Sequence, residues 1–250
     1  MKRALICGIC GKMGQNIVNL LENDDDLRIV CGVDLNKKDG LPPIYASFND
    51  VKESVDVVID FSSPAVLKDE LNWAVKHNVP VVLASTGYTE SDLKLIDQTT
   101  EKIAVFKTGN FSLGINLLVK LVKKTAEVLG EKFDIEIIEK HHNQKVDAPS
   151  GTALMLAESA NSAFNDSKPY VNGRDGIVGK RKNEIGIHAV RGGTVVGEHE
   201  VMFAGEDEII TLSHSARSKR VFAVGAIRSA KWIIGKPTGK YDMSDIFEEI

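Results

Sequence analysis

Short runs of β-branched and other apolar residues alternate with segments of helical periodicity in the first half of the chain. Five runs have the length of buried strands: Ala4–Ile9, Arg28–Asp34, Val55–Phe61, Pro80–Ala84 and Ile103–Phe106. Between them, apolar residues recur every three or four positions in three segments: Met13–Glu22, Pro64–His77 and Glu90–Thr100. This alternation predicts a doubly wound, Rossmann-like α/β domain with a parallel sheet.

The pattern changes character after Asn110-Phe111-Ser112. Three further segments have helical periodicity: Leu113–Leu129, Ser150–Phe164 and Val221–Ile234. Four read as strands: Phe133–Glu139, Glu184–Arg191, Thr194–Phe203 and Glu208–His214. Short glycine-containing junctions separate the last three, which predicts neighbours in one sheet. We therefore expect a second, α+β domain with a mixed, mostly antiparallel four-stranded sheet.

Composition narrows the class of protein. The 250 residues are 43% hydrophobic and 26% charged, as in ordinary globular proteins. The net charge of −4 and the lack of a dominant basic patch predict no nucleic acid partner. The three cysteines are too few for a disulfide framework, and no apolar stretch is long enough to cross a bilayer. These features predict a soluble, cytoplasmic protein without a membrane partner.

A glycine-rich turn follows the first predicted strand. Gly8, Gly11 and Gly14 lead into a helix, and Asp34 ends the second strand twenty positions later. Such a turn lets backbone N–H groups approach a pyrophosphate, while the acid binds a ribose. Cys10 occupies the second glycine position of the usual pattern, so a tight turn without a ligand is the alternative. Asp34 alone also fits a solvated strand end.

The cofactor expected at this turn is NADH or NADPH. Asp34 favours NADH, whereas Lys37 and Lys38 suit a 2′-phosphate or simply form a solvated loop. The preference is therefore open.

Two more turns lie at the carboxyl ends of predicted strands. Ala84-Ser85-Thr86-Gly87 follows the fourth strand, and Thr108-Gly109-Asn110-Phe111 follows the fifth. Either is compatible with ordinary turn chemistry, but their coincidence at one sheet edge favours a cofactor cleft. Cys7 and Cys10 have a C-x-x-C spacing, which we interpret as packing because no second pair completes a zinc site.

The most informative segment runs from Glu139 to Ala153. His141, His142 and Lys145 precede Ser150-Gly151-Thr152, which opens a predicted helix. Cationic side chains and free helix N–H groups together suit a small anionic substrate, and histidine transfers protons near neutral pH. A surface loop before a capped helix is the alternative. Adjacent histidines without a further ligand motif do not predict a metal site.

These residues resemble the 4-hydroxy-tetrahydrodipicolinate (dihydrodipicolinate) reductase family, whose motif His-His-x-x-Lys-x-Asp-Ala-Pro-Ser-Gly-Thr-Ala matches residues 141–153. The resemblance extends along the whole chain. Its other motifs are the glycine turn at 8–14, Asp60-Phe61-Ser62, Ser85-Thr86-Gly87, Asn110-Phe111-Ser112, the 134–139 strand, Arg191-Gly192-Gly193 with Gly197-Glu198-His199, and 225–228.

The resemblance implies a division of roles. A dinucleotide-binding domain would comprise residues 1–112 and 222–250, and a substrate-binding domain that also forms a homotetramer would comprise 113–221. His141 and Lys145 would be catalytic, transferring the proton. His142, Ser150, Gly151 and Thr152 would bind the small dicarboxylate substrate. The nicotinamide cofactor would be held by Gly8, Ile9, Cys10, Gly11, Lys12, Met13, Asp34, Ala84, Ser85, Thr86, Thr108, Gly109, Asn110 and Phe111.

The expected function is NAD(P)H-dependent reduction of 4-hydroxy-tetrahydrodipicolinate to tetrahydrodipicolinate in diaminopimelate and lysine biosynthesis. Two alternatives share the glycine turn: an oxidoreductase acting on another small carboxylate, and a non-catalytic dinucleotide-binding regulator. Neither alternative requires the combination of His141, Lys145 and the helix N-terminus at Gly151. A zinc hydrolase using His141 and His142 is a third alternative, which elemental analysis would detect.

Overall fold

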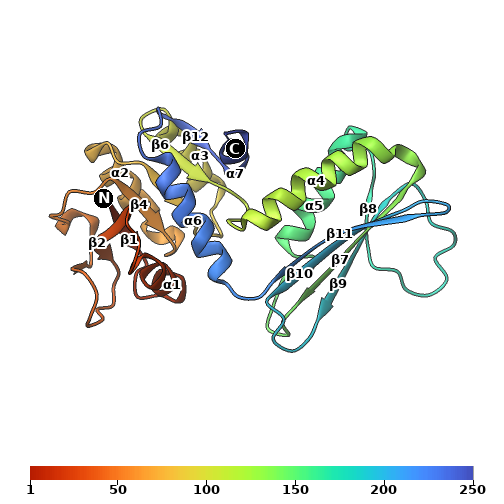
Figure 1. Cartoon of the computed structure of the whole chain (residues 1–250), viewed down its shortest axis with the longest axis horizontal. Coiled ribbons are helices and arrows are strands. Elements are labelled where there is room, and N and C mark those ends of the chain that lie inside the picture. Colours follow the sequence, from red (N-terminus) through yellow and green to blue (C-terminus); the bar gives the residue numbers. More distant parts are fainter. Residues whose placement is uncertain (250) are drawn as a thin grey trace. The chain divides into compact units, whose positions relative to one another are not determined.

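The apolar runs of the first half lie in one parallel, seven-stranded sheet (Figure 1). The computed structural model describes residues 1–249, and this sheet belongs to a unit made of Met1–Phe111 and the chain from Arg220 onward. Its strand order is β12-β6-β5-β4-β1-β2-β3. The bounds are Lys2–Cys7 (β1), Leu27–Val33 (β2), Ile44–Tyr45 (β3), Val57–Asp60 (β4), Val81–Leu83 (β5), Ala104–Lys107 (β6) and Gly239–Tyr241 (β12).

Helices cover this sheet in two groups. Helices α1 (Lys12–Leu21) and α6 (Arg220–Ile233) contact each other, as do α2 (Leu67–His77) and α3 (Glu90–Thr100). Alternate strand residues such as Leu5 and Cys7 pack with α2 and α3 in one core cluster. The doubly wound architecture expected from the sequence is confirmed. Three short elements complete the unit: a 3₁₀ turn at Phe48–Asp50, another at Pro64–Val66, and α7 (Met243–Glu248).

The second unit, Ser112–Lys219, contains a mixed sheet. Its strand order is β11-β10-β7-β9-β8, with two antiparallel pairings (β10 with β11 and β7) and two parallel ones (β9 with β7 and β8). The strands are Asp134–His141 (β7), Tyr170–Asn172 (β8), Ile185–Arg191 (β9), Gly197–Ala204 (β10) and Ile209–Ala216 (β11). The helices are α4 (Leu113–Leu129) and α5 (Gly151–Asn161), each followed by a 3₁₀ turn, at Gly130–Lys132 and Ser162–Phe164.

The mixed α+β character is confirmed, but two details of this sheet differ from the sequence expectation. It has five strands rather than four, because the three residues of β8 extend an edge that sequence pattern assigned to a loop. Strands β9 and β10 are not neighbours, since β7 lies between them. Strand β7 is suited to this central position because the residues on its inner face are buried. Ile135 and Ile137 are at most 1% exposed.

Only one face of the second sheet is covered by the helices of its unit. Helices α4 and α5 pack on a core that includes Ile137, Val201 and Phe203. Along β10, residues alternate between this buried face and a half-buried opposite face that carries Glu200 and Met202. Among the helices of the described chain, none combines the length and hydrophobicity of a membrane span.

Candidate active site

The turn after β1 brings the backbones of three segments unusually close together. Gly8 has φ +77°, and a Cβ there would lie 2.8 Å from the carbonyl oxygen of Phe61. A Cβ on Gly14 would lie 2.3 Å from the oxygen of Gly8. Gly11 precedes α1, and no side chain caps this helix. The turn is therefore a bare helix N-terminus with room for an anionic group, which fits a dinucleotide pyrophosphate.

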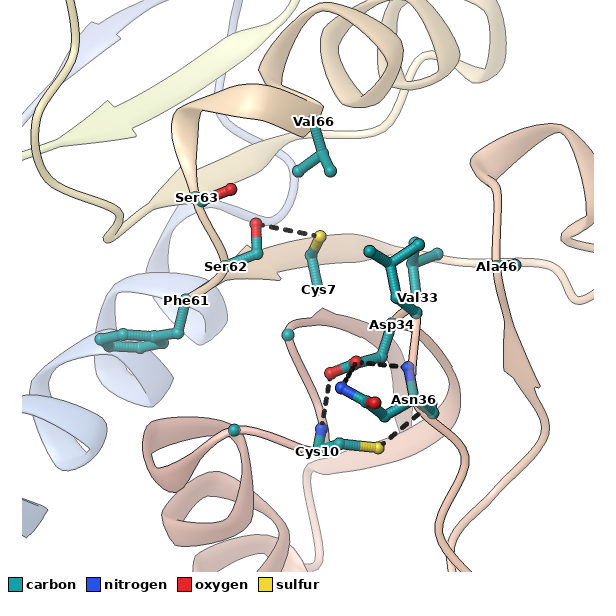
Figure 2. Close-up of a pocket in the computed structure, with 13 residues that line it drawn as sticks. Cys7, Cys10, Val33, Asp34, Asn36, Ala46, Phe61, Ser62, Ser63 and Val66 are labelled. Carbon is teal, nitrogen blue, oxygen red and sulfur yellow. Dashed lines mark hydrogen bonds between the residues drawn. The ribbon is translucent and has the colours of Figure 1, made fainter.

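Asp34, at the end of β2, holds this turn in place. Its Oδ2 accepts a hydrogen bond from the backbone N–H of Cys10 at 2.9 Å, and its Oδ1 accepts one from Asn36 N–H at 2.9 Å (Figure 2). Both interactions leave lone pairs on the carboxylate for ribose hydroxyls. The geometry thus allows Asp34 to orient the turn and bind a ligand at once.

A pocket of about 350 Å³ opens beside these residues. Of the predicted cofactor residues, Gly8, Cys10, Gly11 and Asp34 line it. Ile9 is fully buried and does not line the pocket, and Lys12 and Met13 lie in the first turn of α1. Figure 2 shows that the opposite wall comes from the segment after β4, which sequence reasoning did not assign to the site. Its residues are Phe61, Ser62, Ser63 and Val66.

The other predicted cofactor residues follow β5 and β6, which are adjacent and parallel. The turns after these two strands therefore lie at the same edge of the sheet. They contain Ala84, Ser85 and Thr86 after β5, and Thr108, Gly109 and Asn110 after β6, and none of these six residues lines the pocket. The side chain of Phe111 is buried and packs between the rings of Phe61 and Phe106, at centroid distances of 6.1 and 6.0 Å. This packing makes its aromatic ring a core element.

A buried polar cluster lies under the pocket. Cys7, Asp60 and Glu70 have potential ligand atoms within 4.8 Å of one another. Burial, followed by the charges of Glu70 and Asp60, holds the pKa of the Cys7 thiol well above its usual range. Burial likewise raises the pKa of Glu70, whose carboxyl oxygens have no hydrogen-bond partner among the described residues. Cys7 is therefore a protonated thiol unsuited to nucleophilic chemistry.

In the second unit, His141 lies at the end of β7 beside a buried carboxylate. Its Nδ1 is 2.6 Å from Oε2 of Glu139, two residues earlier on the same face of the strand. Arg191, from β9, donates to both oxygens of Glu139 at 2.8 Å. Sequence reasoning did not assign Glu139 or Arg191 to the site, although both belong to motifs shared with the family.

The start of α5 adjoins the same carboxylate. Ser150 N–H donates to Glu139 Oε1 at 3.0 Å, while Ser150 Oγ accepts from Ala153 N–H and caps the helix. Gly151 and Thr152 form the first turn, and nothing lies within 4 Å of a Cβ placed on Gly151. The predicted anion-binding terminus is thus linked to the predicted proton donor through Glu139.

Lys145 and His142 lie in the segment between β7 and α5. Lys145 Nζ forms an ion pair with Asp147 Oδ1 at 2.7 Å, and Arg191 donates to the backbone oxygen of Asp147 at 2.6 Å. The Nδ1 of His142 is buried and has no hydrogen-bond partner within residues 1–249. Arg191 therefore ties this segment to the sheet that carries His141.

His199, from β10, completes the cluster and was also missed from sequence. Its ring packs edge-on against His141 at 5.1 Å, and its Nε2 lies 3.0 Å from Ser150 Oγ. Burial, with a smaller contribution from the charge of His141, lowers the pKa of His199 to about 4. His199 is therefore uncharged at physiological pH and packs against His141 at one side of the site.

This shift predicts a pH-dependent stability. Between pH 4 and 6.5 the unfolded chain protonates His199 and the folded chain does not, so the free energy of unfolding falls as pH decreases through this window. A shift of this size is worth about 3 kcal/mol. Urea unfolding at several pH values in this window gives the free energy of unfolding as a function of pH. In His199→Gln, this free energy should fall less steeply with decreasing pH than in the wild type. Equal slopes would contradict the assignment.

The first unit has a Rossmann-type fold of the kind found in dinucleotide-binding domains, with a glycine turn before its first helix. A probable dehydrogenase from Thermotoga maritima shares the fold with a TM-score of 0.62 at 14% identity, covering 96% of this chain and 91% of that one. The matching family models are described as dihydrodipicolinate reductase, N-terminus, over residues 2–111, and dihydrodipicolinate reductase, C-terminus, over residues 114–247. The chain belongs to the dihydrodipicolinate reductase family, which confirms the resemblance seen in its motifs.

Relatives match over their full length. A 4-hydroxy-tetrahydrodipicolinate reductase from Caldanaerobacter subterraneus subsp. tengcongensis is 48% identical, covering 100% of this chain and 99% of the relative. One from Clostridium novyi is 45% identical, covering 99% of both. The structure of a dipicolinate-bound dihydrodipicolinate reductase from Paenisporosarcina sp. TG-14 has a TM-score of 0.79 at 26% identity and 97% coverage of both chains.

Proposed function

We propose that this chain catalyses the NAD(P)H-dependent reduction of 4-hydroxy-tetrahydrodipicolinate to tetrahydrodipicolinate, a step of diaminopimelate and lysine biosynthesis. It is an oxidoreductase of the family that its full-length relatives define. The observation that carries this proposal is the cluster of His141, Lys145 and the α5 N-terminus, in a chain that matches reductases from end to end. Dipicolinate bound to a structural relative supports a small dicarboxylate as the ligand.

The residues of the second unit suit a dicarboxylate ring. The N–H groups of Gly151 and Thr152 would bind one carboxylate at the positive end of α5, and His142 would bind the other. Bound reduced nicotinamide would supply a hydride to the ring once the substrate hydroxyl has left as water together with a proton from an adjacent ring carbon. His141 or Lys145 would supply the proton to the neighbouring carbon.

A coupled assay tests this function. A synthase that condenses pyruvate with aspartate semialdehyde supplies the substrate, and absorbance reports oxidation of NADH or NADPH. Oxidation that depends on the synthase and on this chain supports the proposal. Stable absorbance with both nucleotides would refute it.

We also propose that Asp34 binds the adenosine ribose of NADH. Removing a charged hydrogen-bond acceptor costs about 1.5–3 kcal/mol, so Asp34→Ala should weaken NADH binding from micromolar Kd by about tenfold or more. Lys37 or Lys38, which follow Asp34 in the same loop, would interact with the 2′-phosphate of NADPH. NADPH binding should therefore remain measurable. Calorimetry measures the Kd for both nucleotides, with Asp39→Ala as a control variant in the same loop. An unchanged Kd for NADH in Asp34→Ala would reject the assignment of Asp34 to the ribose.

A homotetramer is the proposed assembly. The sheet face opposite α4 and α5 carries half-buried residues such as Met202, and Val190 on β9 is 48% exposed. A second copy of this chain would cover such a surface. Light scattering at micromolar protein concentration should return four times the 27.3 kDa chain mass. A monomeric mass would contradict the proposal.

The proposed location is the cytoplasm. All three cysteines are free, and Cys7 and Cys31 are buried, which suits a reducing compartment.

A further inference from the structure

Glu139 is a fully buried carboxylate that contacts the proposed proton donor without belonging to the substrate site. It is 0% exposed and accepts four hydrogen bonds from three residues. His141 Nδ1 lies 2.6 Å from Oε2, Arg191 donates twice at 2.8 Å, and Ser150 N–H donates at 3.0 Å. A buried carboxylate with its acceptor sites filled in this way is an orienting group.

The charge state of Glu139 follows from these contacts. Burial opposes ionisation, but the hydrogen bonds of Arg191, His141 and Ser150 outweigh it and lower the pKa of Glu139. An ionised carboxylate has no hydrogen to donate, so the hydrogen between Glu139 and His141 belongs to Nδ1 of the imidazole. The proton that His141 exchanges must then be on Nε2.

The surroundings of His141 agree with this orientation. A Cβ on Gly197 would lie 3.0 Å from Nε2, so the absence of a side chain there leaves space at that nitrogen. His199 packs edge-on against the ring and is itself neutral, because burial lowers its pKa to about 4. The ring is thus fixed by Glu139 on one edge and by His199 against its plane.

We propose that Glu139 is a positioning residue that fixes the tautomer and orientation of His141, and that Arg191 keeps this carboxylate from taking the proton itself. The same carboxylate holds Ser150, so it also sets the N-terminus of α5 relative to the proton donor. Aligning donor and substrate anchor through one rigid group is a means of preorganisation. The catalytic role of this tautomer rests on the function proposed above. The tautomer itself does not depend on that function.

Nitrogen-15 NMR of histidine-labelled protein tests the tautomer directly. The neutral His141 ring of the wild type should show a protonated Nδ1 and an unprotonated Nε2. A wild-type ring protonated at Nε2 would overturn the proposal, whether or not the chain is a reductase. In Glu139→Gln, whose amide can donate as well as accept, the His141 signals should show a mixture of tautomers.

Kinetics test the consequence. Glu139→Gln should lower kcat by about 10- to 1000-fold while the Kd for NADH stays within about twofold. Glu139→Asp retains the charge and should recover part of kcat. Glu139→Gln with Arg191→Met removes both charges, avoids a buried unpaired guanidinium, and should be as slow as the single variant. Normal kcat in either folded Gln variant would refute the positioning role.

Glu136 offers a matched control on the same strand. It also accepts hydrogen bonds from two arginines, Arg174 and Arg181, and from His188 at 2.7 Å, but on the opposite face of β7. Glu136→Gln should leave kcat and the His141 signals unchanged. If Glu136→Gln reduced kcat as strongly as Glu139→Gln, the effect would be general loss of sheet order and the proposal would fail.

Discussion

Replacing His141 or Lys145 by alanine should lower kcat by about 10²–10⁴-fold and leave the Kd for NADH unchanged. Each side chain is hypothesised to act on the proton or on charge that develops during reduction, so its loss is felt in the transition state. The two residues belong to the second unit, whereas the glycine turn and Asp34 belong to the first. Steady-state kinetics and calorimetry on the same preparations separate the two effects.

Thr152 should respond differently from these two residues. Thr152→Ala should mostly raise KM, because binding lost equally in the ground and transition states leaves kcat unchanged. Lys140→Ala is a control, since Lys140 is exposed on β7 and pairs with Glu198 at 3.3 Å. If His141→Ala and Lys145→Ala both kept normal kcat and only raised KM, they would be binding residues, and the proton would have to come from water.

Gly8→Ala should abolish most nucleotide binding, with an increase in the Kd for NADH of about 100-fold or more. The left-handed φ of +77° costs a non-glycine residue about 1–2 kcal/mol, and the new Cβ would also lie 2.8 Å from the Phe61 oxygen. Because the Phe61 oxygen is a backbone atom, this contact can be relieved only if the turn or the segment after β4 moves. Both line the pocket.

Gly40 provides a control with the same backbone conformation. Its φ is also +77°, but nothing lies within 4 Å of a Cβ built there. Gly40→Ala should therefore lower the free energy of unfolding by about 1–2 kcal/mol with little effect on Kd. Similar Kd values for Gly8→Ala and Gly40→Ala would show that the close approach at Gly8 is not needed for binding the nucleotide.

The helices of this protein were readable from sequence because their apolar spacing and caps are local properties. Helices α3 and α4 have the predicted bounds, and Gly130 follows directly after the last residue of α4. Strands β3, β8 and β12 were not predicted, because two or three residues carry no usable alternation. Their presence depends on pairing with strands distant in sequence.

The order of strands in the second sheet was harder to predict for a physical reason. The short Gly192-Gly193 junction suggested that β9 and β10 pair with each other, as in a hairpin. Instead both pair with β7, one parallel and one antiparallel. A short junction limits how far apart two strand ends can lie. It does not exclude a third strand between them.

In the second unit, the candidate site was predictable only where its residues are contiguous. The segment from His141 to Thr152 stood out as a local concentration of imidazole, ammonium and helix-capping residues. Glu139, Arg191 and His199 come from β7, β9 and β10, and only strand pairing brings them together. Glu139 precedes His141 by two residues on a strand, and that spacing is a signal that sequence reasoning did not use.

The most direct measurement follows the transferred atom. Substrate made by the coupled synthase is reduced with NADH or NADPH deuterated at the hydride-donating carbon, and mass spectrometry examines the product. Tetrahydrodipicolinate carrying one deuterium, formed by the wild type and greatly reduced in His141→Ala, is the predicted result. Oxidised nucleotide without deuterated tetrahydrodipicolinate, or no oxidation by either nucleotide, would contradict the assignment of this chain as the reductase.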